Sequence, residues 1–430
     1  MKSIQIALLG CGTVGAGVAQ ILRQNQAIIR VKTGVALEIA AVLVRDKTKN
    51  YPVAPELLTT DFEAILNAPE IKLVVELTNG IEPASSFMLR AMAAGKHVIS
   101  ANKAAVVANY AALMAASARN HVMFRYEAAV AGGIPILDAL QAPLNSNDIE
   151  EINGIINGTT NFILTQMTEN GWSYEQALIE AQKLGFAEAD PTADVAGIDA
   201  ANKLAILAAI AFGKLLDVSD IPTAGIHTIT ADDIAVADEL GYTIKLLATV
   251  KKSENKLQFS VSPTLVPKKH LLANVRNEMN AVFVRGNAVG ELIFYGAGAG
   301  GLPTGSAVVG DAIEIANALD KGAAFDSYVN QLASTPLVSL GEGENKYYIR
   351  LVGKNKPGVL GKIATMLGEF GVLITGVVQP ETTAARATMI FTVGQCERAQ
   401  LDAALRQLQL VTSELTDGAE IDVKEIMRIL

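Results

Sequence analysis

The feature that most constrains the fold is the segment IQIALLGCGTVGAGVAQ (residues 4–20), where an apolar run meets three spaced glycines. The run IQIALLG is typical of a buried strand, and TVGAGVAQILRQ has the apolar spacing of a helix. The glycines at the join form the pattern G-x-G-x-x-G. They permit a tight turn, close approach of a pyrophosphate to the backbone, and close packing of helix on strand. This glycine pattern alone also fits a plain tight turn, but here it follows a predicted strand and opens a predicted helix, as a dinucleotide site requires. We therefore predict a dinucleotide site at the helix N-terminus, formed by Gly10, Gly12, Thr13, Val14 and Gly15.

Strand-like runs alternate with helical patterns through residues 1–130. Further strands are expected at EIAAVLVR (38–45), LVVELT (73–78), HVIS (97–100) and HVMFRYE (121–127), and PASSFMLRAMAAG and NYAALMAASARN are expected to be helices between them. Such alternation predicts a mostly parallel sheet with crossover helices. The fold class is therefore α/β, with a Rossmann-type NAD(P)-binding domain over residues 1–130.

Two further domains are expected. Residues 131–302 mix long helices (175–184, 199–213, 231–240) with half-buried strand patterns, which indicates an α+β substrate domain. A helix over 303–320 follows a glycine-rich turn and is expected to pack back onto the first domain. Residues 334–346 are polar and turn-rich and are expected to be a linker. Residues 347–430 read in the order βαββαβ, which fits a small ferredoxin-like domain.

Composition excludes several classes of protein. Half of the 430 residues are apolar and 18% are charged, which argues against disorder. The net charge of −9 argues against nucleic-acid binding. Two distant cysteines and four histidines without ligand spacing fit neither a disulfide framework nor a zinc site. No apolar run reaches about 18 residues, so no membrane span is expected. The glycines in the first apolar run argue against a signal peptide. These observations favour a cytoplasmic protein.

Polar residues follow several of the predicted strands. Ligands of open parallel sheets bind beyond the carboxyl ends of the strands. Thr78 and Asn79 in ELTNG and Lys103 in SANKAAV would therefore line one crevice. Arg45 ends the second strand, where an arginine accommodates the 2′-phosphate of NADP and an acid holds the 2′-hydroxyl of NAD. Arg45 favours NADP, although Asp46 follows it and leaves NAD open.

Two acidic stretches remain. Glu127 precedes the glycine turn in EAAVAGGIP, and a carboxylate beside turned carbonyls can hold a hard cation. In GFAEADPTADVAGIDAANK (185–203), Asp199 and Lys203 lie four residues apart and would share a helix face. A lysine beside an apolar helix can act as a general acid in carbonyl reduction. The same spacing also fits a simple helical ion pair. Asp190, directly before Pro191, is expected to shape a turn.

Several motifs follow one another along the chain, namely GCGTVG, ANK, EAAVAGGIP, NGTTNFIL, LGFAEADPTADVAGIDAANKLAILA and GAGAGGLPTGSAVVGD. Together they resemble the homoserine dehydrogenase family of the bacterial type. The resemblance implies interconversion of L-aspartate 4-semialdehyde and L-homoserine with NAD(P)H, a step toward threonine, methionine and isoleucine. It implies that Lys203 donates the proton to the aldehyde oxygen and that Lys103 lies by nicotinamide and substrate. It also implies a substrate pocket formed by Gly185, Glu188, Asp194 and Asp199. It implies a sodium site formed by the Glu127 carboxylate and the main chain of Val130, Gly132 and Ile134. Finally, it implies that Gly300 contacts the cofactor.

The sequence departs from the family pattern at two places. Some relatives carry another acid where Ala193 stands, which puts a four-acid pocket of their kind in doubt. The tail resembles an ACT domain through NKPGVLGKIA (355–364), which usually opens with Asp where Asn355 stands. The resemblance implies L-threonine as a feedback effector and a homo-oligomer, either dimer or tetramer. A dimerisation module without ligand is the alternative reading of the tail.

Two other functions compete with the leading one. The chain can be a different NADP-dependent dehydrogenase of a small amino- or hydroxy-acid aldehyde. It can also be an amino-acid sensor without enzymatic activity, which would make Lys103 and Lys203 dispensable.

Overall fold

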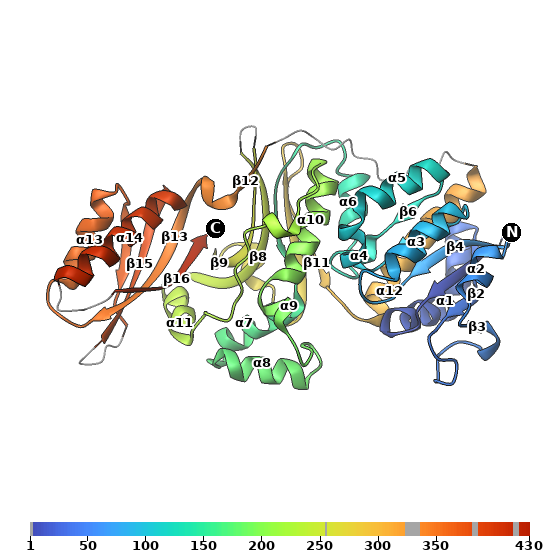
Figure 1. The fold of residues 1–430 in the computed structure, drawn as a ribbon, viewed down its shortest axis with the longest axis horizontal. Coiled ribbons are helices and arrows are strands. Elements are labelled where there is room, and N and C mark those ends of the chain that lie inside the picture. The colour runs from blue at the N-terminus through green and yellow to red at the C-terminus, as the bar shows by residue number, and fades with distance from the viewer. Residues whose placement is uncertain (1–2, 254–255, 323–335, 381–385, 416–420) are drawn as a thin grey trace. The chain divides into compact units, whose positions relative to one another are not determined.

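The computed structural model describes residues 3–253, 256–322, 336–380, 386–415 and 421–430. It confirms the α/β class, with a parallel sheet near the N-terminus and a second, mixed sheet (Figure 1). The chain forms two compact units, which are Met1–Asp148 with Ala205–Leu216 and Phe294–Ser334, and Ile149–Leu204 with Asp217–Ile293 and Thr335–Leu430. The expected boundary after residue 130 therefore falls inside the first unit.

In the described part of the chain, the first sheet has six strands in the order β3-β2-β1-β4-β5-β6, all of them parallel. This is the doubly wound order of dinucleotide-binding folds, with its switch point between β1 and β4. The strands are β1 (Ser3–Leu9), β2 (Ala36–Leu43), β3 (Leu58–Thr59), β4 (Ile71–Glu76), β5 (His97–Ser100) and β6 (Phe124–Arg125). The crossover and flanking helices are α1 (Thr13–Thr33), α2 (Phe62–Asn67), α3 (Ala84–Ala93), α4 (Lys103–Ala108), α5 (Tyr110–Asn120) and α6 (Ile136–Gln141).

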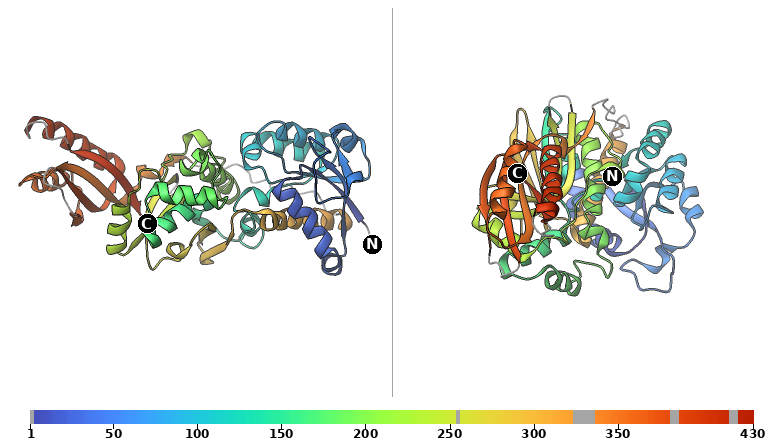
Figure 2. Two further views of the ribbon diagram at one scale, coloured as in Figure 1. Left: turned by 90° about the horizontal axis from the view of Figure 1, so that it is seen from below. Right: turned by 60° about the vertical axis from the view of Figure 1, so that its left-hand side comes forward.

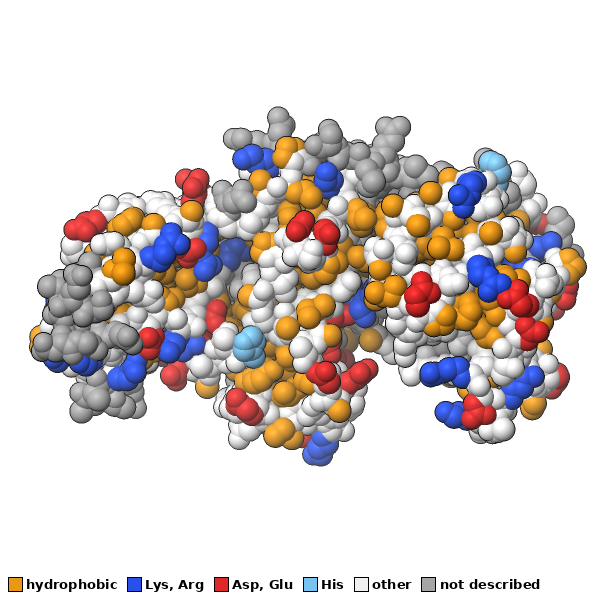
Figure 3. All heavy atoms as spheres, viewed as in Figure 1, with side chains coloured by type: hydrophobic (Ala, Val, Ile, Leu, Met, Phe, Trp, Pro, Cys, Tyr) orange, Lys and Arg blue, Asp and Glu red, His pale blue; other side chains and the backbone are white. Residues whose placement is uncertain are grey.

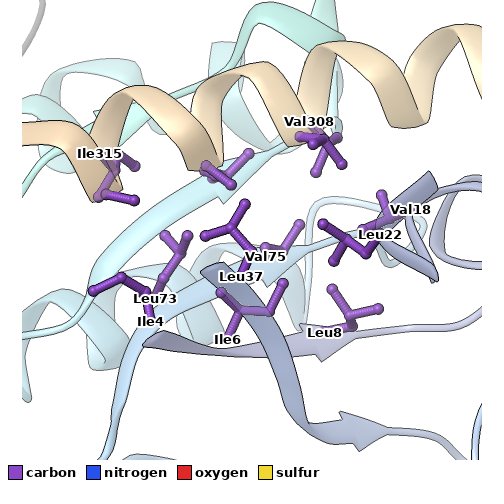
Figure 4. Close-up of a cluster of buried hydrophobic side chains, with 14 of the residues drawn as sticks. Ile4, Ile6, Leu8, Val18, Leu22, Leu37, Leu73, Val75, Val308 and Ile315 are labelled. Carbon is purple, nitrogen blue, oxygen red and sulfur yellow. The ribbon is translucent and has the colours of Figure 1, made fainter. Parts of the chain in front are cut away.

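Helix α12 (Gly301–Lys321) belongs to the core of this first unit. Val308 and Ile315 of α12 lie in one apolar cluster with Val18 of α1 and with side chains of β1, β2 and β4 (Figure 4). Three glycines let α12 and α1 approach closely. A Cβ on Gly17 would lie 1.9 Å from the carbonyl oxygen of Gly301, so only glycine fits at Gly17.

Within the residues that the structure describes, the second sheet has ten strands, of which nine follow the order β11-β10-β7-β8-β9-β16-β13-β15-β14, while β12 pairs with β9. Its first strands are β7 (Ile149–Ile155), β8 (Tyr242–Ser253), β9 (Lys256–Pro267), β10 (Met279–Gly286) and β11 (Gly290–Ala297). The helices of this region are α7 (Gly158–Asn170), α8 (Tyr174–Lys183), α9 (Thr192–Val195), α10 (Ile198–Phe212) and α11 (Ala231–Glu239). Short 3₁₀ helices occupy Pro55–Leu57, Glu127–Ala129, Val218–Asp220, Leu271–Asn274 and Leu340–Glu342.

The C-terminal segment has the βαββαβ order that the sequence predicts. It consists of β13 (Glu344–Lys354), α13 (Val359–Glu369), β14 (Ile374–Val378), β15 (Arg386–Glu397), α14 (Arg398–Leu415) and β16 (Asp422–Ile429). Both helices lie on one face of the four strands and share an apolar core with them (Figures 1 and 2).

This segment is not separated from the rest of the second unit. Strand β16 pairs in parallel with β9 at Arg428 and Ile429, so the two sets of strands form one continuous sheet. Part of the expected linker is also a strand, since β12 (Leu337–Ser339) pairs in parallel with β9. Residues 334 and 335 of that expected linker lie outside the described residues. The expected linker therefore contains a short strand at 337–339, which pairs with residues 257–259 of β9.

Two surface properties follow from the described residues. None of the helices in the described part of the chain is long and apolar enough to cross a membrane. On the face shown in Figure 3, acidic and basic side chains lie interspersed among apolar ones.

Candidate active site

The glycine turn joins β1 to α1. Gly10 has φ +105°, a left-handed conformation that favours glycine, and a Cβ on Gly15 would lie 2.6 Å from the carbonyl oxygen of Gly10. Gly12 is the N-cap of α1, with no side chain to satisfy the first N–H groups. Those N–H groups and the helix dipole favour an anion at this end.

A second helix begins at the same place. Gly300 is the N-cap of α12 and has φ +117°. A Cβ on Gly301 would lie 2.9 Å from the carbonyl oxygen of Thr13. The two glycine-rich helix starts therefore lie side by side, although nearly 290 residues separate them in the chain. Two helix N-termini directed to one place strengthen its attraction for a phosphate.

A pocket of about 240 Å³ lies beyond the carboxyl ends of β4 and β5. Its lining brings together predicted residues from three separate motifs, Val14, Thr78 and Lys103. Asn102, which the sequence analysis did not single out, joins the two loops. Its amide donates to the carbonyl oxygens of Thr78 at 3.0 Å and Gly80 at 2.7 Å. Its Oδ1 also accepts from the backbone N–H of Ala105, which caps α4.

A buried carboxylate lies directly beneath this pocket. Glu76, the last residue of β4, is 0% exposed. It accepts hydrogen bonds from the backbone N–H and the hydroxyl of Thr78, and from the hydroxyl of Ser100. Burial raises the pKa of Glu76, while these hydrogen bonds oppose the rise.

The end of β2 presents a cation rather than an acid. Arg45 is exposed. The carboxylate of Asp46 accepts hydrogen bonds from the N–H and the hydroxyl of Thr48, and these bonds lower the pKa of Asp46. The acid that left NAD open is thus engaged in a local turn.

Lys203 is at the centre of a buried polar cluster in the second unit. Its Nζ donates to Asp199 Oδ2 at 2.7 Å and to the carbonyl oxygen of Ile156 at 2.7 Å. The side chains of Lys203 and Asp199 are 12% and 8% exposed. The ion pair that the four-residue spacing predicts is therefore present. It lies in the first turns of α10.

Asn157 and Thr159 complete this cluster, and the sequence analysis missed both. Asn157 Nδ2 donates to Asp194 Oδ1 at 2.7 Å and to Asp199 Oδ2 at 2.9 Å. The hydroxyl of Thr159 donates to Asp194 Oδ2 at 3.1 Å. Burial raises the pKa of Asp194, and the hydrogen bond from Asn157 opposes that rise. Both residues belong to the motif NGTTNFIL, whose asparagine before a helical run is a helix-cap signal.

The remaining predicted substrate residues lie on an exposed turn after α8. Glu188 and Gly185 are both exposed, and Gly185 has φ +80°. Neither Glu188 nor Gly185 takes part in the hydrogen bonds of Lys203 that are described above. Asp190 accepts from the N–H and the hydroxyl of Thr192, as expected for a residue that shapes this turn.

Glu127 is in a buried acidic cluster of the first unit. Its carboxylate accepts from the N–H groups of Leu137 and Asp138 at the start of α6. Burial, followed by repulsion from Asp138, raises the pKa of Glu127 to about 8. Asp311 is 1% exposed, its Oδ1 has no hydrogen-bond partner among the described residues, and burial raises its pKa well above the usual range.

The oxygen donors of this cluster suit a hard cation. Asp138, Asp311 and Glu314 present oxygens within 4.8 Å of one another. The main chain from Glu127 to Ile134 forms a tight turn, and a Cβ on Gly132 would lie 2.5 Å from the carbonyl oxygen of Gly298. The Glu127 carboxylate, which keeps lone pairs beside its two hydrogen bonds, and the turned carbonyls are thus the candidate ligands.

Known proteins resemble this chain over most of its length. The family model for the homoserine dehydrogenase NAD-binding domain matches residues 10–127, and the model for homoserine dehydrogenase matches residues 135–313. Homoserine dehydrogenase of Pseudomonas aeruginosa is 41% identical over 388 residues, which is 89% of each chain. The crystal structure of a homoserine dehydrogenase from Thiobacillus denitrificans has a TM-score of 0.92 and 40% identity, covering 100% of this chain and 99% of that one.

A hyperthermophilic archaeal homoserine dehydrogenase, a mutant solved in complex with NADPH, has a TM-score of 0.62 and 27% identity. It covers 73% of this chain and 98% of its own. One conclusion follows from the nucleotide-binding sheet with its glycine turn, from the lysine–carboxylate cluster on a buried helix, and from these relatives. The chain belongs to the homoserine dehydrogenase family, whose members are NAD(P)-dependent oxidoreductases.

Proposed function

We propose that this chain interconverts L-aspartate 4-semialdehyde and L-homoserine with NADP(H), and that Lys203 donates the proton to the aldehyde oxygen. The observation that carries the proposal is the fixed geometry of Lys203. Its Nζ uses two of three N–H donors on Asp199 and the carbonyl of Ile156, both at 2.7 Å. The third N–H remains for a substrate oxygen.

The nicotinamide cofactor supplies the hydride, and the chain supplies binding and proton transfer. We assign Lys103 and Thr78 to the nicotinamide side, because both line the pocket beyond β4 and β5. Gly10, Gly12, Thr13, Val14, Gly15 and Gly300 are assigned to the phosphates, since they form the adjoining helix starts. Exposed Arg45 and the engaged carboxylate of Asp46 favour NADP over NAD, as does the archaeal relative solved with NADPH.

The substrate contacts are assigned on the same basis. Asp194 and Asp199 form the polar wall around Lys203 through Asn157. Glu188 and Gly185 are assigned to the amino-acid end of homoserine. Their exposure on the turn after α8 supports this, because it leaves the Glu188 carboxylate accessible to an ammonium group.

The decisive experiment is a homoserine oxidation assay with NADP and with NAD. We expect Lys203→Ala to lower turnover by at least about 10²-fold, the low end for general acid–base catalysis. Calorimetric affinity for NADP should stay unchanged. Lys183→Ala is the matched control, because Lys183 is an exposed lysine of α8 whose side chain is 71% exposed. Near-normal turnover of Lys203→Ala would contradict the role.

A monovalent cation, sodium in the first instance, is proposed at the turn of Glu127, Val130, Gly132 and Ile134. Its support is the pair of buried acids Glu127 and Asp311, and above all Asp311 Oδ1, which has no hydrogen-bond partner among the described residues. The thermal unfolding midpoint should be higher in sodium chloride than in choline chloride at equal ionic strength. Equal midpoints in the two salts would remove the site.

Regulation and assembly are proposed for the C-terminal segment. We infer that residues 347–430 form an ACT regulatory domain whose effector is L-threonine, and that the chain forms a dimer or tetramer. The βαββαβ order supports the first inference. Strand β14 at the outer end of the sheet supports the second. Added L-threonine should inhibit homoserine oxidation, and light scattering should show a multiple of 45.2 kDa. No inhibition, or a monomeric mass, would contradict the respective inference.

A further inference from the structure

Glu76 is a buried carboxylate for which the reaction described above has no use. It is 0% exposed, and the three hydrogen bonds it accepts all come from neutral groups of Thr78 and Ser100. A buried carboxylate is costly to keep unless it is well paired and hydrogen-bonded. Its place at the end of β4, directly before the loop that lines the nicotinamide pocket, suggests what it does.

We propose that Glu76 fixes the hydroxyl of Thr78 as a hydrogen-bond acceptor and so makes the pocket specific for the carboxamide of the nicotinamide. An ionised carboxylate only accepts hydrogen bonds. The single hydroxyl proton of Thr78 is therefore committed to Glu76 Oε1. The Thr78 oxygen keeps free lone pairs but has no proton left for a ligand.

The same direction of donation continues through Ser100. Its hydroxyl donates to Glu76 Oε2 at 2.8 Å, and its oxygen accepts the backbone N–H of Asn102 at 3.0 Å. Asn102 in turn donates to the carbonyl oxygens of Thr78 and Gly80. Both loops of the pocket are thus tied to one carboxylate, and the Thr78 oxygen is held in a fixed position.

A carboxamide matches this arrangement. Its NH₂ group offers two donors, and a hydroxyl oxygen that can only accept pairs with one of them. The inference rests on the proposed placement of the nicotinamide beside Thr78 and Lys103. Glu76 is a positioning residue in this account, because it acts through Thr78.

The test compares the binding of two cofactors by isothermal titration calorimetry. The probes are NADP⁺ and its 3-acetylpyridine analogue, in which a methyl ketone keeps the carbonyl but lacks the N–H donors. We expect the wild-type chain to bind NADP⁺ about fivefold more tightly than the analogue, the ratio that one ordinary hydrogen bond provides. In Glu76→Gln the new amide can donate to Thr78, so the hydroxyl proton can turn to the pocket and the ratio should fall toward one.

Two variants of Thr78 separate the possible failures. Thr78→Val should abolish the preference for NADP⁺, and Thr78→Ser, which keeps the hydroxyl, should retain it. If Thr78→Val abolishes the preference but Glu76→Gln keeps it, Glu76 has only a structural role and the inference is overturned. If Thr78→Val keeps the preference, the placement of the nicotinamide fails together with the inference. If Glu76→Gln does not fold, a wild-type ratio near one, or loss of the ratio in Thr78→Ser, still overturns it.

Discussion

Asn157 allows a direct test of how the Lys203 cluster is held together. Its Nδ2 donates to both Asp194 and Asp199, while its Oδ1 accepts the N–H of Thr160 and caps α7. Asn157→Ser keeps a capping oxygen, because serine and asparagine cap helices about equally well. The substitution therefore removes the two donors to the carboxylates while it keeps an oxygen at the cap that the N–H and the hydroxyl of Thr160 contact.

The size of the effect follows from these two contacts. A hydrogen bond to a charged group contributes roughly 1.5–3 kcal/mol. Asn157 is 5% exposed, so water does not easily replace it. Two such bonds at the low end give a loss of about 3 kcal/mol in the free energy of unfolding. Lys203 donates to the same Asp199 Oδ2 that Asn157 contacts, so the loss of Asn157 should also displace Lys203 and lower turnover. The rate falls about tenfold for each 1.4 kcal/mol by which the activation free energy rises.

Unfolding in urea can be followed by the fluorescence of Trp172, the chain's single tryptophan, which lies between α7 and α8. Ser173→Ala is the matched control, because Ser173 caps α8 and has no described hydrogen bond to the cluster. It should lose about 1 kcal/mol, as the loss of a cap alone does, and should keep normal turnover. If Asn157→Ser were no less stable than Ser173→Ala and equally active, the bridging role of Asn157 would be refuted.

Three further predictions concern the first unit. Burial lowers the pKa of His97 to about 4, so its protonation favours the unfolded chain. The contribution of His97 to the free energy of unfolding should be complete above pH 6.5 and should fall by about 3 kcal/mol toward pH 4. His97→Gln should flatten this loss in urea titrations at several pH values. Gly17→Ala should lower the thermal unfolding midpoint sharply, because its Cβ would strike the carbonyl of Gly301. The control Gly310→Ala, whose Cβ would lie in open space on α12, should keep or raise the midpoint. Equal midpoints of the two variants would contradict the close approach of α1 and α12. Arg45→Ala should lower kcat/KM for NADPH more than for NADH, and an unchanged ratio of the two would remove Arg45 from the 2′-phosphate.

Much of the fold could be predicted from local patterns. Strand β1, the glycine turn and α1 follow from an apolar run, spaced glycines and helical periodicity within 30 residues. The pairing of Asp199 with Lys203 also follows from local geometry, because a helix brings residues four apart onto one face. The βαββαβ order of the tail is local in the same sense, since each element carries its own periodicity.

The contacts that complete the sites could not be read in this way. Asn157 meets Asp199 across 42 residues, and Asn102 meets Thr78 across 24. A helix cap signal identifies Asn157 as a cap, but the carboxylates that its amide contacts depend on how α7 and α10 pack. The role of Glu76 is equally hidden, because an acid at the end of an apolar strand gives no sign that it is buried.

The sequence by itself determined many of the longer elements, the mostly parallel strands of the first domain with their glycine turn, and the helix that carries Lys203, because periodicity and glycine spacing act over short distances. Only the tertiary structure decided that β16 joins the tail to β9 and that Asn157 links Asp194 to Asp199. These are contacts between segments far apart in the chain. They depend on which surfaces can be buried together, and no local pattern records that.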